Sequence, residues 1–206
     1  ATSSVALFEL ATDICMLDCP EQPHTSPHFM EVLKRDPSQI DLYLRLSEIT
    51  LQEGNDRDAL HWLGRAELID MRNIDILLRQ AGVYQRMKRF DEAIRTLNRA
   101  IGLDETNIKA LKSMRQIYLD SRRWEEAIRI QRSILKFTKG KQAEEEETLF
   151  YLGLKYEHAR DLLTRGGEKN LENALKEVKE IVREQKTFQP GFVLLGDIYG
   201  IIGSAP

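Results

Sequence analysis

A fixed spacing of 34 residues constrains the fold of this chain more than any other feature of its sequence. Ala59, Ala93 and Ala127 lie at that interval, and large apolar residues around them follow the same register. A period of this length is typical of stacked helix pairs, because one pair cannot bury its apolar face alone. The sequence therefore predicts an all-α repeat protein, with three regular repeats over residues 40–141.

The repeat weakens before this segment. Residues 1–39 contain apolar residues at helical spacing over 3–17, followed by a loop rich in proline. A second helix is predicted after Ser26 and Pro27, and it should end before Asp36-Pro37. We interpret residues 1–39 as a degenerate leading helix pair.

The period is stretched after the regular repeats. Residues 142–188 are predicted to form a further helix pair, in which the small residue of the second helix is Ala174. Counted from its first-helix pattern, that small residue is due at position 165, nine residues before Ala174. Nine residues are therefore inserted, and we expect an extended first helix to hold most of them. Residues 189–206 are predicted to be the first helix of a truncated further repeat.

Composition excludes several classes of function. The chain has no run of 18 apolar residues, so it predicts no transmembrane helix, and its two cysteines favour a reducing compartment over a disulfide-stapled fold. It lacks a glycine-rich phosphate loop, a GxSxG motif and an HExxH motif, so we expect no enzyme, no small-molecule substrate and no cofactor. His158 lies in the extended helix with no nucleophile near it in sequence.

Charge is concentrated in the third repeat. Residues 108–141 carry 10 basic and 3 acidic side chains, whereas the whole chain has a net charge of −3. A basic segment can attract nucleic acid. Because these cations are spread around two predicted helices, a solvated face or a site for an acidic peptide is favoured over nucleic acid.

One cluster has the residue types of a zinc site. Cys15, Cys19, His24 and His28 are spaced Cys-x3-Cys-x4-His-x3-His. Cysteine and histidine are the usual ligands of structural zinc. The gap of four residues is much shorter than in Cys2His2 fingers and a helical array needs no metal, so we predict no metal and keep zinc as the alternative.

The small and large positions of the second repeat, residues 74–107, follow a recognisable order. They are Leu77, Ala81, Tyr84, Phe90, Ala93, Leu97 and Ala100. This order resembles the tetratricopeptide repeat family, and the third repeat departs from it at Arg115, where the family has a small residue. The resemblance implies a right-handed superhelical solenoid of helix–turn–helix repeats, whose first helices line an inner groove.

The same resemblance implies that exposed positions of the first helices bind a partner protein or peptide. Those positions are Leu44, Glu48, Gln52, Leu78, Gly82, Gln85, Arg86, Lys112, Gln116, Leu119, Asp120, Phe150, Leu154 and Glu157. They mix apolar and charged side chains, which favours an amphipathic helix or an extended peptide as ligand. Only Lys112 fits the Lys and Asn set with which co-chaperones of this family grip a peptide carboxylate.

A second resemblance covers residues 110–199. The runs ALKSMRQIYLDSRRWEEAIRIQRSILK, KQAEEEETLFYLGLKYE and FQPGFVLLGDIY look like the bacterial lipopolysaccharide assembly protein B family. That family implies a bacterial cytoplasmic scaffold, tethered to the inner membrane by an anchor that would lie outside this chain. The alternatives are a generic oligomerising adaptor with the same repeats, or a regulator that binds zinc or nucleic acid.

Overall fold

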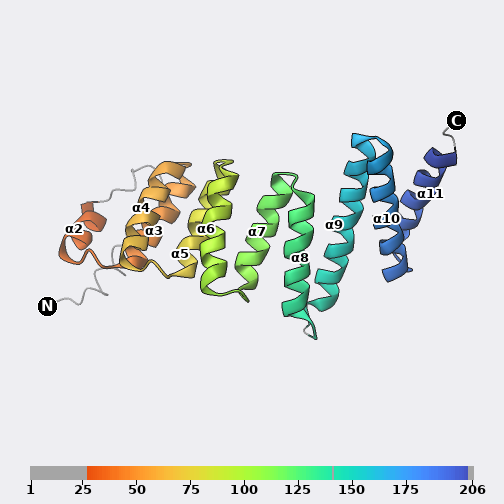
Figure 1. Cartoon of the computed structure of the whole chain (residues 1–206). Helices are drawn as coiled ribbons and strands as arrows, with labels where there is room; N and C mark the ends of the chain where they lie inside the picture. The colour runs from red at the N-terminus through yellow and green to blue at the C-terminus, as the bar shows by residue number, and fades with distance from the viewer. Residues whose placement is uncertain (1–26, 141, 204–206) are drawn as a thin grey trace. The chain divides into compact units, whose positions relative to one another are not determined.

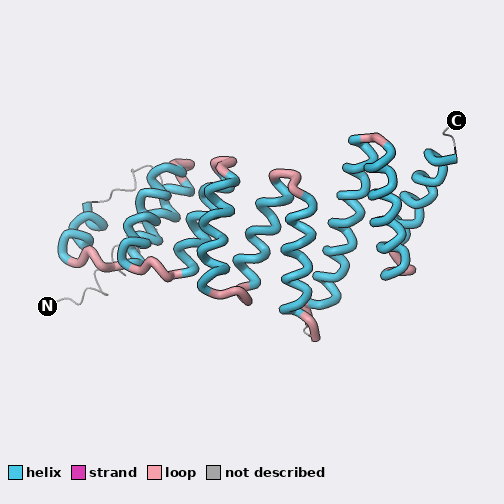
Figure 2. Tube along the Cα trace, viewed as in Figure 1, coloured by secondary structure: helices cyan, strands magenta, loops and turns pink. Residues whose placement is uncertain are grey.

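The computed structural model describes residues 27–140 and 142–203. Within these residues every regular element is an α-helix, which confirms the predicted fold class (Figures 1 and 2). The chain divides into an N-terminal unit that ends at Glu105 and a C-terminal unit that begins at Thr106. This boundary falls inside the predicted segment 40–141, and the four segments proposed from sequence remain predictions.

Each unit is built from helices joined by short turns. The N-terminal unit contains α2 (Pro27–Arg35), α3 (Ile40–Gln52), α4 (Asp56–Ile69), α5 (Ile74–Arg86) and α6 (Phe90–Leu103). The C-terminal unit contains α7 (Ile108–Asp120), α8 (Trp124–Thr138), α9 (Glu144–Arg165), α10 (Glu168–Glu184) and α11 (Gln189–Gly203). The pairs α3/α4, α5/α6 and α7/α8 start 34 residues apart, as the sequence period predicts.

An asparagine is the N-cap residue of three of these helices. The side chains of Asn55, Asn73 and Asn107 accept hydrogen bonds from backbone N–H groups in the first turns of α4, α5 and α7. Such caps satisfy N–H groups that have no partner inside the helix. From sequence Asp56 would be expected to cap α4, but Asp56 is its first helical residue and Asn55 is the cap.

The turn inside each regular pair uses one left-handed residue. Gly54, Lys88 and Arg122 have φ values of 78°, 59° and 55°, and they too lie 34 residues apart. Only glycine adopts this conformation without steric cost, so the backbone of Lys88 and of Arg122 is strained at these turns.

Small residues form the contact between the two helices of each pair. Ala59, Ala93 and Ala127 are completely buried, as their spacing predicts. At the start of the N-terminal unit, Phe29 of α2 is also fully buried and packs with Leu42 and Leu46 of α3. The predicted helix over residues 3–17 lies outside the described residues.

The stretched repeat is an extended helix pair. Helix α9 has 22 residues, nine more than the 13 of α5, and Ala174 of α10 is completely buried, both as predicted. The loop between them is only Gly166 and Gly167, at φ values of 69° and 89°. Figure 1 shows α9 and α10 side by side as the longest helices of the C-terminal unit.

The packing register of α9 differs in part from the pattern found in sequence. That pattern comprises Leu149, Leu152, Gly153 and Tyr156; Leu152 is buried as it predicts, but Leu149 is 47% exposed. Instead Ala159 and Leu162 pack with Ala174 and Val178 of α10. This later register brings Lys155 and His158 into the interior, which has consequences for the site described next.

Candidate functional site

The predicted binding positions of the N-terminal unit lie on α3 and α5. Glu48 links these helices, because its carboxylate accepts from Arg45 at 3.1 Å and from Arg79 at 2.5 Å. Burial raises the pKa of Glu48, but hydrogen bonds from the two arginines outweigh it and leave the pKa lowered. Arg86 pairs with Asp56 at 3.0 Å. Two of the predicted side chains are therefore already engaged within the unit.

The other predicted positions of this unit are more varied. Leu44 and Leu78 are half-buried, and Gln85 is also partly buried. Gln52 and Gly82 are exposed. The N-terminal unit thus presents few free apolar side chains along its first helices.

The predicted positions of the C-terminal unit lie on α7 and α9. Lys112, Gln116, Phe150 and Glu157 are at least partly accessible, and we call these four the C-terminal first-helix face. Phe150 is 37% exposed, and the Arg115 guanidinium lies 3.7 Å from the centre of its ring. An arginine at this distance is attracted to the face of the ring and holds it in place.

Of three further predicted positions, Leu154 and Leu119 contribute less surface, whereas Asp120 is exposed. Leu154 is only 5% exposed and packs in a core cluster with Ile128 and Ile181, so it offers almost no area to a ligand. Leu119 packs against the same cluster. Asp120 accepts a hydrogen bond from Gln116 at 2.9 Å.

A buried polar network supports the C-terminal first-helix face. Arg115 Nη1 donates to Gln131 Oε1 at 2.5 Å and to Glu147 Oε2 at 2.9 Å. Gln131 Nε2 donates to the Glu147 backbone carbonyl at 2.8 Å, and Lys112 Nζ lies 2.5 Å from Glu147 Oε1. These bonds join α7, α8 and α9 and fix the positions of Lys112 and of Arg115, whose guanidinium lies against the Phe150 ring.

Glu147 is the centre of this network. It is 2% exposed. Burial raises the pKa of Glu147, but hydrogen bonds from Gln131, Lys112 and Arg115 outweigh it and leave the pKa lowered. The carboxylate is therefore charged at neutral pH despite its burial.

Sequence reasoning found parts of this network without connecting them. Arg115 is the departure from the family's small residue, and Gln131 shares the register of Leu63 and Leu97. Glu147 is one of four consecutive glutamates, a run that favours a helix start, and it lies in the first turn of α9. The signal that could have linked them is that two polar residues replace core residues in the same repeat.

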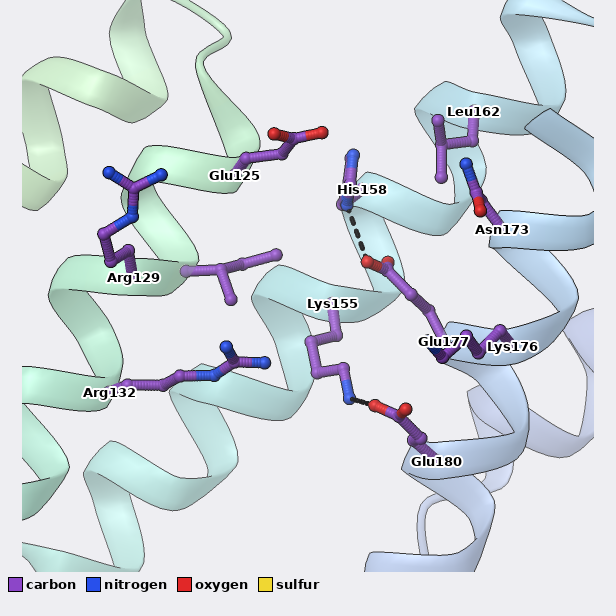
Figure 3. Close-up of a pocket in the computed structure, with 11 residues that line it drawn as sticks. Glu125, Arg129, Arg132, Lys155, His158, Leu162, Asn173, Lys176, Glu177 and Glu180 are labelled. Atoms are coloured by element: carbon purple, nitrogen blue, oxygen red, sulfur yellow. Dashed lines mark hydrogen bonds and ion pairs between the residues drawn. The ribbon is translucent and has the colours of Figure 1, made fainter. Parts of the chain in front are cut away.

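A pocket of about 420 Å³ lies between α8, α9 and α10 of the C-terminal unit. Figure 3 shows α8 providing Arg129 and Arg132 on one side, and α10 providing Glu177 and Glu180 on the other. The pocket also contains Lys155 and His158 of α9, together with Glu125, Ile128, Leu162, Asn173 and Lys176.

Two polar contacts between α9 and α10 form the inner part of this pocket. Lys155 is 2% exposed, and its Nζ donates to Glu180 Oε2 at 2.5 Å. His158 is 7% exposed, and its Nδ1 lies 2.9 Å from Glu177 Oε1 (Figure 3). The Glu177 side chain is 20% exposed, so this acid lies partly inside the protein rather than on the open surface of α10.

The lining of the pocket is mainly charged. The pocket residues include charged, amide and aliphatic side chains but no serine, threonine, tyrosine or cysteine. Among the described residues no group of three histidine, cysteine or acidic side chains could hold a metal ion. Cys15, Cys19 and His24 lie outside the described residues, and the side chain of His28 does too, so the zinc alternative stays a hypothesis.

Comparison with solved structures decides the fold. A tetratricopeptide repeat protein from Parabacteroides merdae has a TM-score of 0.62 and 15% identity, and the match covers 98% of this chain and 75% of that one. The chain has a tetratricopeptide repeat fold. YrrB, described as a TPR protein with an unusual peptide-binding site, has a TM-score of 0.58 and 15% identity over 92% of this chain and 90% of its own.

A MamA structure also shares this tetratricopeptide repeat fold, with a TM-score of 0.51 and 16% identity over 87% of this chain and 94% of its own. No protein-family model and no curated protein sequence matches the chain. The resemblance to lipopolysaccharide assembly protein B thus gains no support. No helix within residues 27–140 and 142–203 is long and apolar enough to span a membrane.

Proposed function

We propose that this chain is a protein-interaction scaffold that binds an amphipathic helix or extended peptide through its C-terminal first-helix face. The observation that carries the proposal is the exposed ring of Phe150, which lies against the Arg115 guanidinium, while Arg115 and Lys112 are both bonded to buried Glu147. Aromatic side chains, phenylalanine included, and arginine are enriched at protein interfaces relative to the rest of the surface. The peptide-binding site reported for YrrB lends support from a protein of the same fold.

The face offers two kinds of contact to a partner. Gln116 is exposed one turn along α7 from Lys112, and Glu157 is exposed two turns along α9 from Phe150. An amphipathic helix could bury an apolar side chain against the Phe150 ring and place polar groups against Lys112, Gln116 and Glu157. Because the face carries both signs of charge, it favours a ligand of mixed charge.

The proposal is tested by cross-linking followed by affinity measurement. A photoreactive phenylalanine analogue at position 150 would capture the partner in cells, and the purified partner would then be titrated against variants. Phe150→Ala/Gln116→Arg should weaken binding about tenfold or more, as expected for loss of a dominant contact. These side chains are preferred to Lys112, because Lys112→Glu would place a second carboxylate beside buried Glu147.

A matched control replaces exposed residues on second helices. Leu68 is 73% exposed on α4, and Asn98 is exposed on α6. Leu68→Ala/Asn98→Arg makes the same kinds of change as the test variant and should leave the dissociation constant unaltered. Equal affinity of both variants and the unmodified protein would show that the partner binds elsewhere.

Self-association is a second candidate function, and it rests on α11. Five large apolar residues of this helix are 42–66% exposed: Phe192, Val193, Tyr199, Ile201 and Ile202. Contiguous exposed apolar surface marks interaction sites. We expect Phe192→Glu/Ile202→Glu to shift a self-associating protein to monomer in sedimentation analysis, whereas a monomeric unmodified protein would rule this function out.

A further inference from the structure

The pocket between α8, α9 and α10 has a chemistry that the proposed function does not use. It is formed by different residues from the C-terminal first-helix face, and its volume of about 420 Å³ is that of a small-ligand or side-chain site. Its two inner polar contacts, Lys155 with Glu180 and His158 with Glu177, are made within the protein. The remaining groups therefore decide what the pocket can bind.

The α8 wall carries two arginines and one acid, Glu125. Arg129 and Arg132 are exposed and lie three residues apart, so they share one side of the helix. Arg132 donates its Nε–H to the Tyr151 hydroxyl at 3.1 Å, which fixes the side chain and leaves its Nη groups for another acceptor. Figure 3 shows the Arg132 guanidinium directed towards the middle of the pocket.

The α10 wall offers a hydrogen-bond acceptor. Glu177 Oε1 is engaged by His158, but Glu177 Oε2 is buried and accepts no hydrogen bond from the described residues. A buried carboxylate oxygen without a donor is costly, and an N–H group of a ligand would remove that cost once the carboxyl group turns its Oε2 towards the pocket. The pocket lining as a whole has four cationic side chains, from Arg129, Arg132, Lys155 and Lys176, against three carboxylates.

An acidic peptide matches both walls. Its side-chain carboxylate can take charge-assisted hydrogen bonds from the arginines of α8, and its backbone N–H can donate to Glu177 on α10. A basic peptide would meet the two arginines of α8, and a free inorganic anion would leave the Glu177 oxygen without a donor.

We propose that this pocket binds an acidic side chain of an extended partner peptide, with Arg129 and Arg132 holding the carboxylate and Glu177 accepting a backbone N–H. The site goes beyond the proposed function, because it adds a second peptide contact on second helices. It gives the basic third repeat a specific role, since both arginines belong to that segment.

The test uses three short peptides and the whole protein. N-acetylated, C-amidated Gly-Ser-Glu-Ser-Gly, and versions with Gln or Lys at the centre, are titrated while the ring resonances of His158 and the amides of α8–α10 are followed by NMR. The glutamate peptide should give saturable shifts with a dissociation constant of about 1 mM, and the glutamine and lysine peptides should bind about tenfold more weakly or not at all.

Variants separate a specific site from general charge attraction. Arg129→Glu/Arg132→Gln should weaken the glutamate peptide about tenfold. Lys109→Glu/Lys186→Gln changes net charge equally at exposed positions outside the pocket and should leave binding within about twofold. Absence of saturable shifts, equal binding of the glutamine peptide, or equal weakening by both variants would each overturn the proposal.

Failure of this proposal is distinguishable from failure of the proposed function. Phe150→Ala/Gln116→Arg leaves every pocket residue unchanged, so it should bind the glutamate peptide as the unmodified protein does. Loss of peptide binding in that variant would place the acidic site on the first-helix face and contradict the pocket assignment.

Discussion

The two units of this protein place different chemistry at the same repeat positions. In the N-terminal unit, Ala81 and Leu97 are buried at the small position of α5 and the large position of α6. In the C-terminal unit, Arg115 and Gln131 occupy the equivalent positions, and both remain buried. The repeat therefore tolerates a polar interior, provided that a third residue, Glu147, completes its hydrogen bonds.

This difference matters for function. The N-terminal unit engages Glu48 and Arg86 in ion pairs within itself. In the C-terminal unit the hydrogen bonds among Arg115, Gln131 and Glu147 are buried, and the ring of Phe150 stays accessible. We therefore expect the C-terminal unit to provide the main contact with a partner, and the following experiments compare the two units directly.

The largest expected effect is the loss of the Glu147 charge. Glu147→Gln leaves buried Arg115 without its counter-charge, so the free energy of unfolding of the C-terminal unit should fall by about 3–5 kcal/mol. The chain has two tryptophans, Trp62 in the N-terminal unit and Trp124 in the C-terminal unit, so single-tryptophan variants report each unit in urea titrations.

Glu67 provides the matched control for this change. It pairs with Arg99 in the N-terminal unit, but Arg99 is 51% exposed, so Glu67→Gln should cost about 1 kcal/mol or less. Equal costs for Glu67→Gln and Glu147→Gln would show that the two units do not differ in their polar interiors.

A triple replacement asks whether the C-terminal unit needs a polar interior for stability. Arg115→Met/Gln131→Leu/Glu147→Leu gives it the apolar chemistry of the N-terminal unit. Replacement of a buried ionic group by apolar side chains of similar size is often neutral or stabilising by about 1–4 kcal/mol, so unfolding of the triple variant should be no easier than that of the unmodified protein. A fall in the free energy of unfolding as large as that caused by Glu147→Gln alone would mean that the polar network itself stabilises the fold.

A fall in pH should lower the free energy of unfolding of both units, but Glu147→Gln should alter the pH dependence of the C-terminal unit only. The pKa values of Glu147 and Glu67 are both lowered by hydrogen bonds that outweigh burial. A lowered pKa in the folded state contributes stability above the ordinary value of about 4.3, and this stability is lost as pH falls through the folded-state pKa. Between pH 7 and 3, Glu147→Gln should reduce the fall in the free energy of unfolding that Trp124 reports. The fall that Trp62 reports should be unchanged.

The smallest expected effect lies where the units agree. Lys88 and Arg122 both adopt the left-handed turn conformation, so Lys88→Gly and Arg122→Gly should each stabilise their own unit by about 0.5–1 kcal/mol. Urea unfolding checks both, and a destabilisation at either position would show that the side chain contributes more than its strained backbone costs.

Local pattern predicted much of the fold. The 34-residue period located the paired helices α3 to α8, and the buried alanines followed from the need for close helix approach. The extended α9 followed from a count of inserted residues. These features depend on short-range spacing, which one sequence displays directly.

The features that were missed depend on residues far apart in the chain. Arg115, Gln131 and Glu147 come from three different helices, and each looks like an isolated exception until packing brings them together. The pocket depends on the later packing register of α9, which turns Lys155 and His158 inward. A helix with apolar residues in two competing registers does not reveal from its own sequence which one its neighbours select.

The most direct test of the account is hydrogen–deuterium exchange of the protein with the partner captured at position 150. The account predicts slower exchange within residues 112–120 and 147–157 on binding, with residues 40–52 and 74–86 of the N-terminal unit unchanged. Protection confined to α3 and α5, with none on α7 and α9, would contradict the assignment of the main binding surface to the C-terminal unit.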